Sequence, residues 1–131
     1  MTHHHLPASP ETCHWGFFES RLKPVLTVDS GDEVTIDSIS GGPDVVPDTS
    51  KFHVPPELFD VHARSERMVP GHILTGPVAV RGAEVGDVLE VDILDVQLRQ
   101  DWGYNFIRPL AGTLPDDFHE SRLLNIPLDK E

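Results

Sequence analysis

The chain has almost no cysteine and no long apolar run. Cys13 is the only cysteine in 131 residues, so an intrachain disulfide is impossible and a disulfide-stapled fold is excluded. No stretch approaches the roughly 20 consecutive apolar residues of a membrane-spanning helix, and the first residues lack the apolar centre of a signal peptide. We therefore expect a soluble protein that works in the cytoplasm and has no membrane partner.

Basic residues are also scarce. Ten Lys and Arg stand against 22 Asp and Glu, which gives a net charge of −12 spread over the whole length. A field of this sign repels polyanions, so the composition argues against a nucleic-acid partner. The simplest role of the charge is a solvated surface.

Several motifs of familiar enzymes are missing. The sequence contains no phosphate-binding glycine loop, no paired-cysteine motif, no His-Glu-x-x-His and no Gly-x-Ser-x-Gly elbow. The corresponding nucleotide-binding, zinc-protease and serine-hydrolase chemistries are therefore not predicted.

The length suits one domain with its own core. Proline and small polar residues make residues 1–11 an irregular lead-in, and residues 12–131 are predicted to form a single β-rich domain. Two hairpins are expected, one joining residues 25–28 to 33–37 and one joining 78–80 to 88–96, each across a Gly-Asp turn. The second strand alternates apolar residues up to Ile93 and then shifts phase, which predicts a β-bulge or burial of both faces.

The remaining segments predict one helix and two more strands. Residues 55–64 start with proline, carry an acidic first turn and space their apolar residues as a helix does. Residues 102–109 and 123–129 favour strands, whereas residues 38–48 are typical of a loop. The expected fold is mainly β, an antiparallel, jelly-roll-like β-sandwich with one short helix.

Histidine and aspartate supply the candidate metal ligands, although no spacing is diagnostic. His72 stands between Pro-Gly and a strand, where the backbone can aim its side chain; its structural alternative is a hydrogen bond to a carbonyl. His14 and the loop acid Asp44 complete the candidate set, with packing and a solvated loop as their alternatives. Cys13 is expected to be a buried small residue, because neighbours on a strand point to opposite faces and Cys13 and His14 do not form a nucleophile pair.

Two polar residues on the aromatic segment can donate hydrogen bonds. Asn105 and Arg108 are candidates to stabilise an oxyanion, although Arg108, before a proline, also suits a turn. The three histidines at positions 3–5 can chelate a metal adventitiously or remain from an expression tag, and we expect neither a structural nor a catalytic role for them.

Six ordered segments resemble one known family. Residues 72–91 contain His-x-x-Thr-Gly-Pro followed by Gly-Ala-Glu-x-Gly-Asp, and this run resembles the acetamidase/formamidase family. The other segments similar to that family, in the same order, are His-Trp-Gly-Phe-Phe at 14–18, residues 24–32, Ser-Gly-Gly-Pro at 40–43, Trp-Gly-Tyr-Asn at 102–105 and Gly-Thr-Leu-Pro at 112–115.

The resemblance implies a β-rich, sandwich-like fold and hydrolysis of short linear amides to ammonia and a carboxylate. It also implies a bound divalent metal, zinc or calcium. With this chemistry we assign His14, Asp44 and His72 to the metal, Asn105 to catalysis, and Trp102 and Tyr104 to the small amide substrate.

The sequence departs from the family in one respect. Family members are much longer, and their second half holds an Asp-x-His followed by Gly-Asp-Gly-Glu that resembles the core of the catalytic site; this combination does not occur here. We therefore expect a partial member with little activity alone. The alternatives are a non-catalytic β-module, forming a homo-oligomer or pairing with a complementing second chain through an open sheet edge, and a small metal-binding domain.

Overall fold

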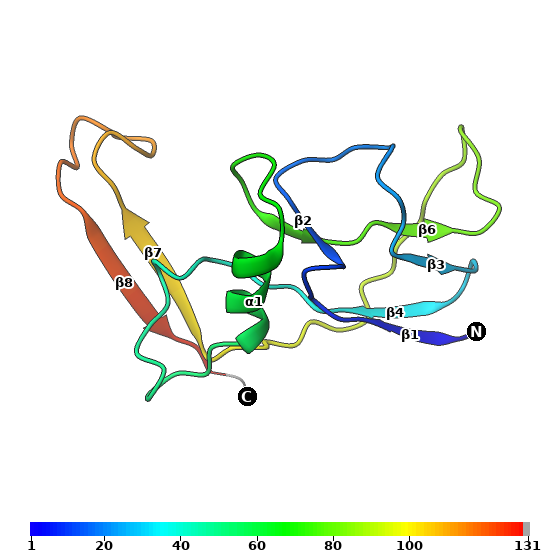
Figure 1. Cartoon of the computed structure of the whole chain (residues 1–131), viewed down its shortest axis with the longest axis horizontal. Helices are drawn as coiled ribbons and strands as arrows, with labels where there is room; N and C mark the ends of the chain where they lie inside the picture. Colours follow the sequence, from blue (N-terminus) through cyan, green and yellow to red (C-terminus); the bar gives the residue numbers. More distant parts are fainter. Residues whose placement is uncertain (130–131) are drawn as a thin grey trace. The chain divides into compact units, whose positions relative to one another are not determined.

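Short strands make up most of the regular structure. The structure is a computed structural model that describes residues 1–129 (Figure 1). Its elements in chain order are β1 (His3–Leu6), β2 (Cys13–Trp15), β3 (Leu26–Val28), β4 (Glu33–Ile36), α1 (Pro56–Arg64), β5 (Ile73–Thr75), β6 (Val78–Val80), β7 (Trp102–Ile107) and β8 (Arg122–Pro127). The predicted class, mainly β with one short helix, is confirmed.

The chain divides into two compact units. Unit 1 comprises residues 1–40 and 56–94, and unit 2 comprises residues 41–55 and the chain from Asp95 onward. Unit 1 therefore contains β1 to β6 and α1, whereas unit 2 contains β7 and β8. The prediction of a single domain over residues 12–131 stays a prediction, because a division into compact units does not test whether they fold as one domain.

Each strand pairs with one partner. β1 pairs with β4 and β3 pairs with β6, both parallel, while β2 pairs with β5 and β7 pairs with β8, both antiparallel. Both predicted hairpins are therefore wrong in their pairing, although residues 26–28, 33–36 and 78–80 are strands as predicted. Both Gly-Asp turns form, but neither returns the chain to the strand before it: β4 pairs with β1 instead, and residues 88–96 pair with no strand that the structure describes. Local turn chemistry does not choose the neighbour in a sheet.

The segment predicted as the longest strand is not a strand. Residues 88–96 belong to none of the sheets that the structure describes, and their apolar side chains are exposed. The predicted bulge near Ile93 is consequently absent as well. A strand needs a neighbour for its backbone groups, and among residues 1–129 this segment has none.

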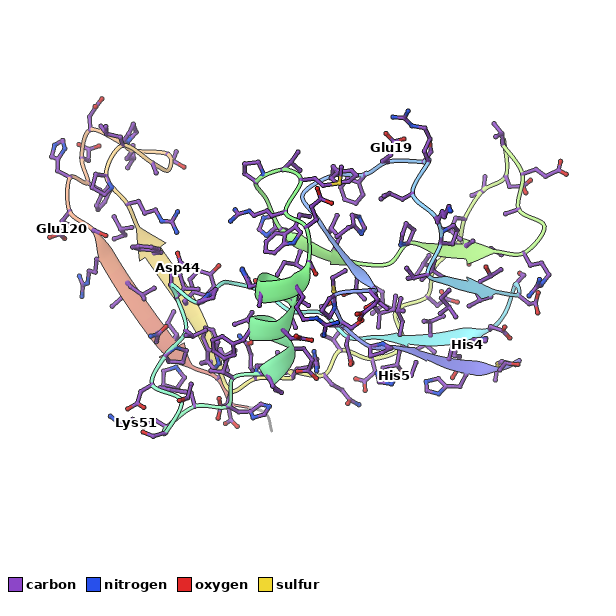
Figure 2. All side chains as sticks on the ribbon, in the orientation of Figure 1. His4, His5, Glu19, Asp44, Lys51 and Glu120 are labelled. Atoms are coloured by element: carbon purple, nitrogen blue, oxygen red, sulfur yellow. The ribbon has the colours of Figure 1, made fainter. Side chains whose placement is uncertain are left out.

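The N-terminal histidines are structural, contrary to expectation. They form most of β1, inside the segment predicted to be irregular, and each ring reaches a side chain at or beside β4. Figure 2 labels His4 and His5. The Nε2 atoms of these rings lie 2.8 Å from Thr35 Oγ1, 3.1 Å from Asp32 Oδ2 and 3.1 Å from Asp37 Oδ2, for His3, His4 and His5 respectively.

Asp32 makes the most contacts that hold β1 beside β4. Its carboxylate accepts hydrogen bonds from the backbone N–H of Thr2 at 2.7 Å and of Asp29 at 3.1 Å, besides contacting His4. The bond from Thr2, followed by those from His4 and Asp29, lowers the pKa of Asp32 from 3.8 to about 2. The ionised carboxylate therefore holds both the start of β1 and the turn before β4.

The helix forms as predicted. α1 begins at Pro56, where the missing N–H costs nothing, has Glu57 in its first turn and ends with basic residues, which suits the helix dipole. Leu58 and Val61 are almost completely buried. Within residues 1–129 there is no helix long and apolar enough to cross a membrane.

Unit 2 is built on one ribbon. β7 and β8 pair along their whole length, from Trp102 opposite Pro127 to Ile107 opposite Arg122 (Figure 1). Trp102 is fully buried and its indole N–H donates to the His53 carbonyl at 3.0 Å. Both predicted strands are therefore confirmed, and every residue of β8 is exposed.

Candidate functional site

The β2–β5 ribbon in unit 1 carries the residue with the clearest unmet bonding capacity. In its register Cys13 lies opposite Thr75 and His14 opposite Leu74. Backbone hydrogen bonds of 2.8 Å close both ends, from the N–H of Gly16 to His72 O and from the N–H of Gly76 to Thr12 O. The ribbon therefore fixes the backbone on either side of His14.

A close approach of two backbones holds the same ribbon in place. Gly16 has φ +70°, and a Cβ there would lie 2.6 Å from the carbonyl oxygen of Pro70. Gly71 approaches equally closely, because its Cβ would lie 2.8 Å from the Cα of Gly16. Only glycine fits at these positions. This close packing explains why glycine follows His14 and Trp15 in the sequence.

Side chains alternate along β2 as a strand requires. Cys13 and Trp15 are buried and His14 between them is half-buried. Cys13 Sγ lies 3.6 Å from Thr75 Oγ1, which donates to the Asp37 carbonyl at 2.7 Å. The prediction that Cys13 is a buried small residue is confirmed.

An open pocket of about 530 Å³ lies on the His14 side of the ribbon. Five of its ten lining residues are polar and come from β2, β5 and the loops after β2 and β4, and the other five are apolar. Its lining residues are His14, Phe18, Glu19, Ser20, Leu22, Ser38, Ile73, Leu74, Thr75 and Pro77.

The Nδ1 atom of His14 is buried and has no hydrogen-bond partner among residues 1–129. Its ring lies edge-on to Phe17, with centroids 5.6 Å apart. A buried ring nitrogen without a partner destabilises the fold unless a bound group satisfies it. Trp15 Nε1 is also buried without a partner, but Trp15 does not line the pocket, so His14 is the better indication of a ligand.

Glu19 supplies negative charge at the same pocket (Figure 2). Its carboxylate accepts from the side-chain and backbone N–H groups of Arg21, with Nη2 at 2.8 Å from Oε2. These bonds lower the pKa of Glu19, so the carboxylate stays ionised near neutral pH. Sequence reasoning missed Glu19, because nothing in its neighbourhood distinguishes it from other surface acids.

His72 lies just before β5 and is exposed. Its carbonyl accepts the hydrogen bond from Gly16, and its side chain is not among those that line the pocket. The structural alternative predicted a hydrogen bond from the His72 ring to a carbonyl. The bond that the structure shows instead uses the backbone carbonyl of His72. Metal binding by His72 stays a prediction.

Asp44, labelled in Figure 2, belongs to unit 2 and pairs with a cation. Arg108 Nη2 lies 3.3 Å from Asp44 Oδ2, and both side chains are exposed. The guanidinium of Arg108 also stacks over Phe106 at 4.4 Å. This arrangement agrees with the alternative role of Arg108, which was to stabilise a turn. It also gives the Asp44 carboxylate a partner within the protein.

The other predicted residues lie on β7. Tyr104 is about two-fifths exposed, with its ring 6.4 Å from that of Trp102 and close to Gly41. Asn105 is exposed. Trp102 is fully buried and presents no surface to a substrate in this structure, so its visible role is to anchor the strand.

The predicted site residues thus fall into two groups. His14 and His72 belong to unit 1, whereas Asp44, Trp102, Tyr104 and Asn105 belong to unit 2. Within residues 1–129 no three His, Cys, Asp or Glu side chains come together as a metal site. The catalytic, metal and substrate assignments stay predictions.

Unit 2 has a smaller pocket that sequence reasoning missed. It has a volume of about 290 Å³ and lies where β7 ends and the following loop folds back. Its lining is mostly apolar, with the Arg108 side chain as its one charged member. The lining residues are Phe106, Ile107, Arg108, Ala111, Gly112, Thr113, Leu114 and Phe118.

Comparison with known proteins identifies relatives. The model of the acetamidase/formamidase family matches residues 6–124. A formamidase of Methylophilus methylotrophus is 46% identical over 55 residues, 38% of this chain and 14% of that protein. An acetamidase of Mycolicibacterium smegmatis is 42% identical over 67 residues, 43% and 16% of the two chains. A putative formamidase of Schizosaccharomyces pombe is 55% identical over 52 residues, 37% and 13%. Each match spans a small part of the relative's length.

Proposed function

The chain belongs to the acetamidase/formamidase family, and from this premise we propose that it carries part of a site that hydrolyses the C–N bond of short linear amides to ammonia and a carboxylate. The observation that carries the proposal is the family match over residues 6–124. The names of the similar proteins, two formamidases and an acetamidase, point to formamide and acetamide as substrates to test.

The pocket beside β2 is the proposed place for the amide. A primary amide offers a carbonyl acceptor and N–H donors within a few ångströms of each other. His14 Nδ1 accepts or donates according to the tautomer of the ring, so an amide can pair with it in either state. Because Nδ1 is buried in the free chain, the ring must turn toward the pocket for this bond to form. The apolar wall, with Leu22, Ile73 and Leu74, suits a short alkyl group.

Hydrolysis needs three things: a water that attacks the carbonyl carbon, donors for the oxyanion, and a proton for the departing nitrogen. We assign His14 to holding the amide, and Asn105 stays the proposed oxyanion donor. The divalent metal, zinc or calcium, stays a proposal that the described residues do not fit by themselves, because no three of their His, Cys, Asp or Glu side chains come together and a usual site has at least three protein ligands. No step is assigned to it.

We also propose a fold for the complete family member and a cellular location for this chain. We propose that the small sheets contribute to the antiparallel, jelly-roll-like sandwich of a complete family member. The cytoplasm remains the proposed location, on the basis of a single buried cysteine.

Binding is tested by the nitrogen resonances of the histidine rings during titration with acetamide. We expect the His14 Nδ1 resonance to shift in a saturable manner, while that of exposed His119 stays constant. Acetone is the matched control, because it has the carbonyl but lacks the N–H donors. A shift with acetone equal to that with acetamide would show that the N–H groups are not recognised, and no shift with either would contradict binding at this pocket.

Activity is tested by ammonia release from formamide and acetamide. We expect the purified chain alone to release little or none, because the family's Asp-x-His and Gly-Asp-Gly-Glu combination is not in its sequence. A rate comparable to that of the Methylophilus methylotrophus formamidase would overturn the proposal that this site is partial.

A second candidate function is that of a β-module which pairs with another chain. β8 has β7 as its only neighbour among residues 1–129, and Leu124 and Ile126 on it are exposed. Unpaired strand edges recruit further strands. A homo-oligomer or a complementing chain would be detected by sedimentation and scattering; a compact monomer at all concentrations would count against this function.

A further inference from the structure

Residues 88–94, Val-Leu-Glu-Val-Asp-Ile-Leu, form a segment of unit 1 with the sequence of a strand and without a sheet. Leu89, Val91 and Ile93 alternate with Glu90 and Asp92, so one face of an extended chain is entirely apolar. This segment is separate from β8 and from the pocket beside His14, and nothing in its chemistry depends on amide hydrolysis.

The apolar side chains of residues 88–94 are far more exposed than packing in a folded chain would leave them. Leu89 is 72% exposed, Val91 70% and Ile93 81%, with Val88 and Leu94 at 92% and 71%. Single exposed apolar residues need no explanation, but here three of them, Leu89, Val91 and Ile93, make one continuous apolar face, and Val88 and Leu94 flank the two acids on the other face.

The backbone of residues 88–94 is equally unsatisfied. Within residues 1–129, none of the seven belongs to a paired strand, and none makes a backbone hydrogen bond in a turn or loop. An apolar ligand or a lipid would cover the side chains and leave these N–H and C=O groups without partners. A β-strand satisfies both needs together.

We propose that residues 88–94 are a docking strand that adds to a β-strand of a second polypeptide, one with apolar residues on one face and lysine or arginine on the other. The apolar residues of that partner would share a core with Leu89, Val91 and Ile93. Its cations would lie across from Glu90 and Asp92.

Charge selects this partner over a second copy of the chain. In an antiparallel pair of two copies centred on Val91, Glu90 of each copy would lie opposite Asp92 of the other. Like charges directly across a ladder are destabilising, and each copy brings a net charge of −12. Both the local and the overall field therefore favour a basic strand.

The probe for this docking strand is a blocked peptide of alternating valine and lysine, added to the full chain. Amide hydrogen exchange is followed for residues 88–94. We expect alternate amides there to exchange more slowly with the peptide, and the same peptide with glutamate in place of lysine to give no protection.

Two proline variants test whether the backbone carries the binding. Val91→Pro removes a central N–H from a segment that is unpaired in the free chain, so it leaves the fold intact and abolishes protection. Val85→Pro is the matched control, because Val85 is fully exposed at the second position of the turn closed by the Asp87 N–H and the Glu84 carbonyl, where proline is favoured. It should bind like the unchanged chain.

Charge reversal tests the specificity. The double variant Glu90→Lys with Asp92→Lys should weaken binding of the lysine peptide about tenfold or more and bind the glutamate peptide instead. Three results would overturn the proposal: no protection with either peptide, protection that survives Val91→Pro, or protection that rises with protein concentration without peptide, which would identify a second copy as the occupant.

Discussion

β1 and the docking strand are both short segments of unit 1, and they differ in what holds them. β1 has a parallel neighbour along all four residues, three histidine rings bonded across to the region of β4, and Leu6 buried at its end. Residues 88–94 have five apolar side chains and no neighbour among the described residues. A strand in this chain therefore exists where a partner meets its backbone, and apolar alternation alone does not make one.

Truncating one leucine in each region should give the largest contrast. Leu6→Ala removes a side chain that is 4% exposed and should cost about 2–5 kcal/mol of unfolding free energy. Leu89→Ala removes one that is 72% exposed and should stay within about 0.5 kcal/mol of the unchanged chain. Urea unfolding measures both, and equal losses would contradict the distinction.

A pair of glycines gives the next contrast. Gly16→Ala adds a Cβ 2.6 Å from a carbonyl oxygen at φ +70° and should cost about 2–3 kcal/mol. Gly86→Ala, in the turn before the docking strand, has φ +108° and open space, so only the cost of the positive φ, about 1–2 kcal/mol, remains. Thermal unfolding distinguishes them; a larger effect at Gly86 would mean that the turn is packed.

The pH dependence sharpens the account of β1. Because the pKa of Asp32 is lowered to about 2, its ionised form stabilises the fold above the ordinary value of 3.8, and this contribution is lost as the pH falls toward 2. In Asp32→Asn that part of the acid dependence should disappear. Fluorescence-detected unfolding between pH 5 and pH 2 compares the two chains, and identical profiles would contradict the role of Asp32.

The smallest effect is expected for a polar substitution in the docking strand. Ile93→Thr keeps the β-branched shape and should leave the unfolding free energy within about 0.5 kcal/mol, because Ile93 is 81% exposed. It should nevertheless weaken binding of the valine–lysine peptide, since it interrupts the apolar face formed by Leu89, Val91 and Ile93. Amide hydrogen exchange with the peptide present detects the change; a marked loss of stability would show that Ile93 is packed.

Local sequence signals predicted local structure well. The proline and acidic turn before Leu58 placed the helix, the aromatic alternation from Trp102 placed β7, and the alternation rule placed Cys13 in the interior. Pairing was predicted poorly, because the partner of each strand lies far along the chain and turn chemistry does not encode it. β1 was missed because histidines become strand residues here only through contacts with Thr35, Asp32 and Asp37.

For the candidate site, too, the local signals were read from the sequence and the long-range contacts were not. His14 was chosen for its place in a motif, and the structure adds a reason that the motif does not contain, a buried Nδ1 without a partner beside a pocket. Asp44 was chosen as an unexplained loop acid, and its pairing with Arg108, 64 residues away, supplies the explanation. Trp102 was expected at the substrate, and its burial depends on tertiary packing that composition does not reveal.

Amide hydrogen exchange of the isolated chain near neutral pH tests the central claim most directly. The N–H groups of Glu33 and Asp37 donate to the carbonyls of Thr2 and Leu6, at 2.9 and 3.0 Å, and should exchange slowly. The amides of residues 88–94 should exchange as fast as those of an unfolded peptide. Slow exchange across residues 88–94 without any partner would contradict the claim that this segment has no strand neighbour within the chain.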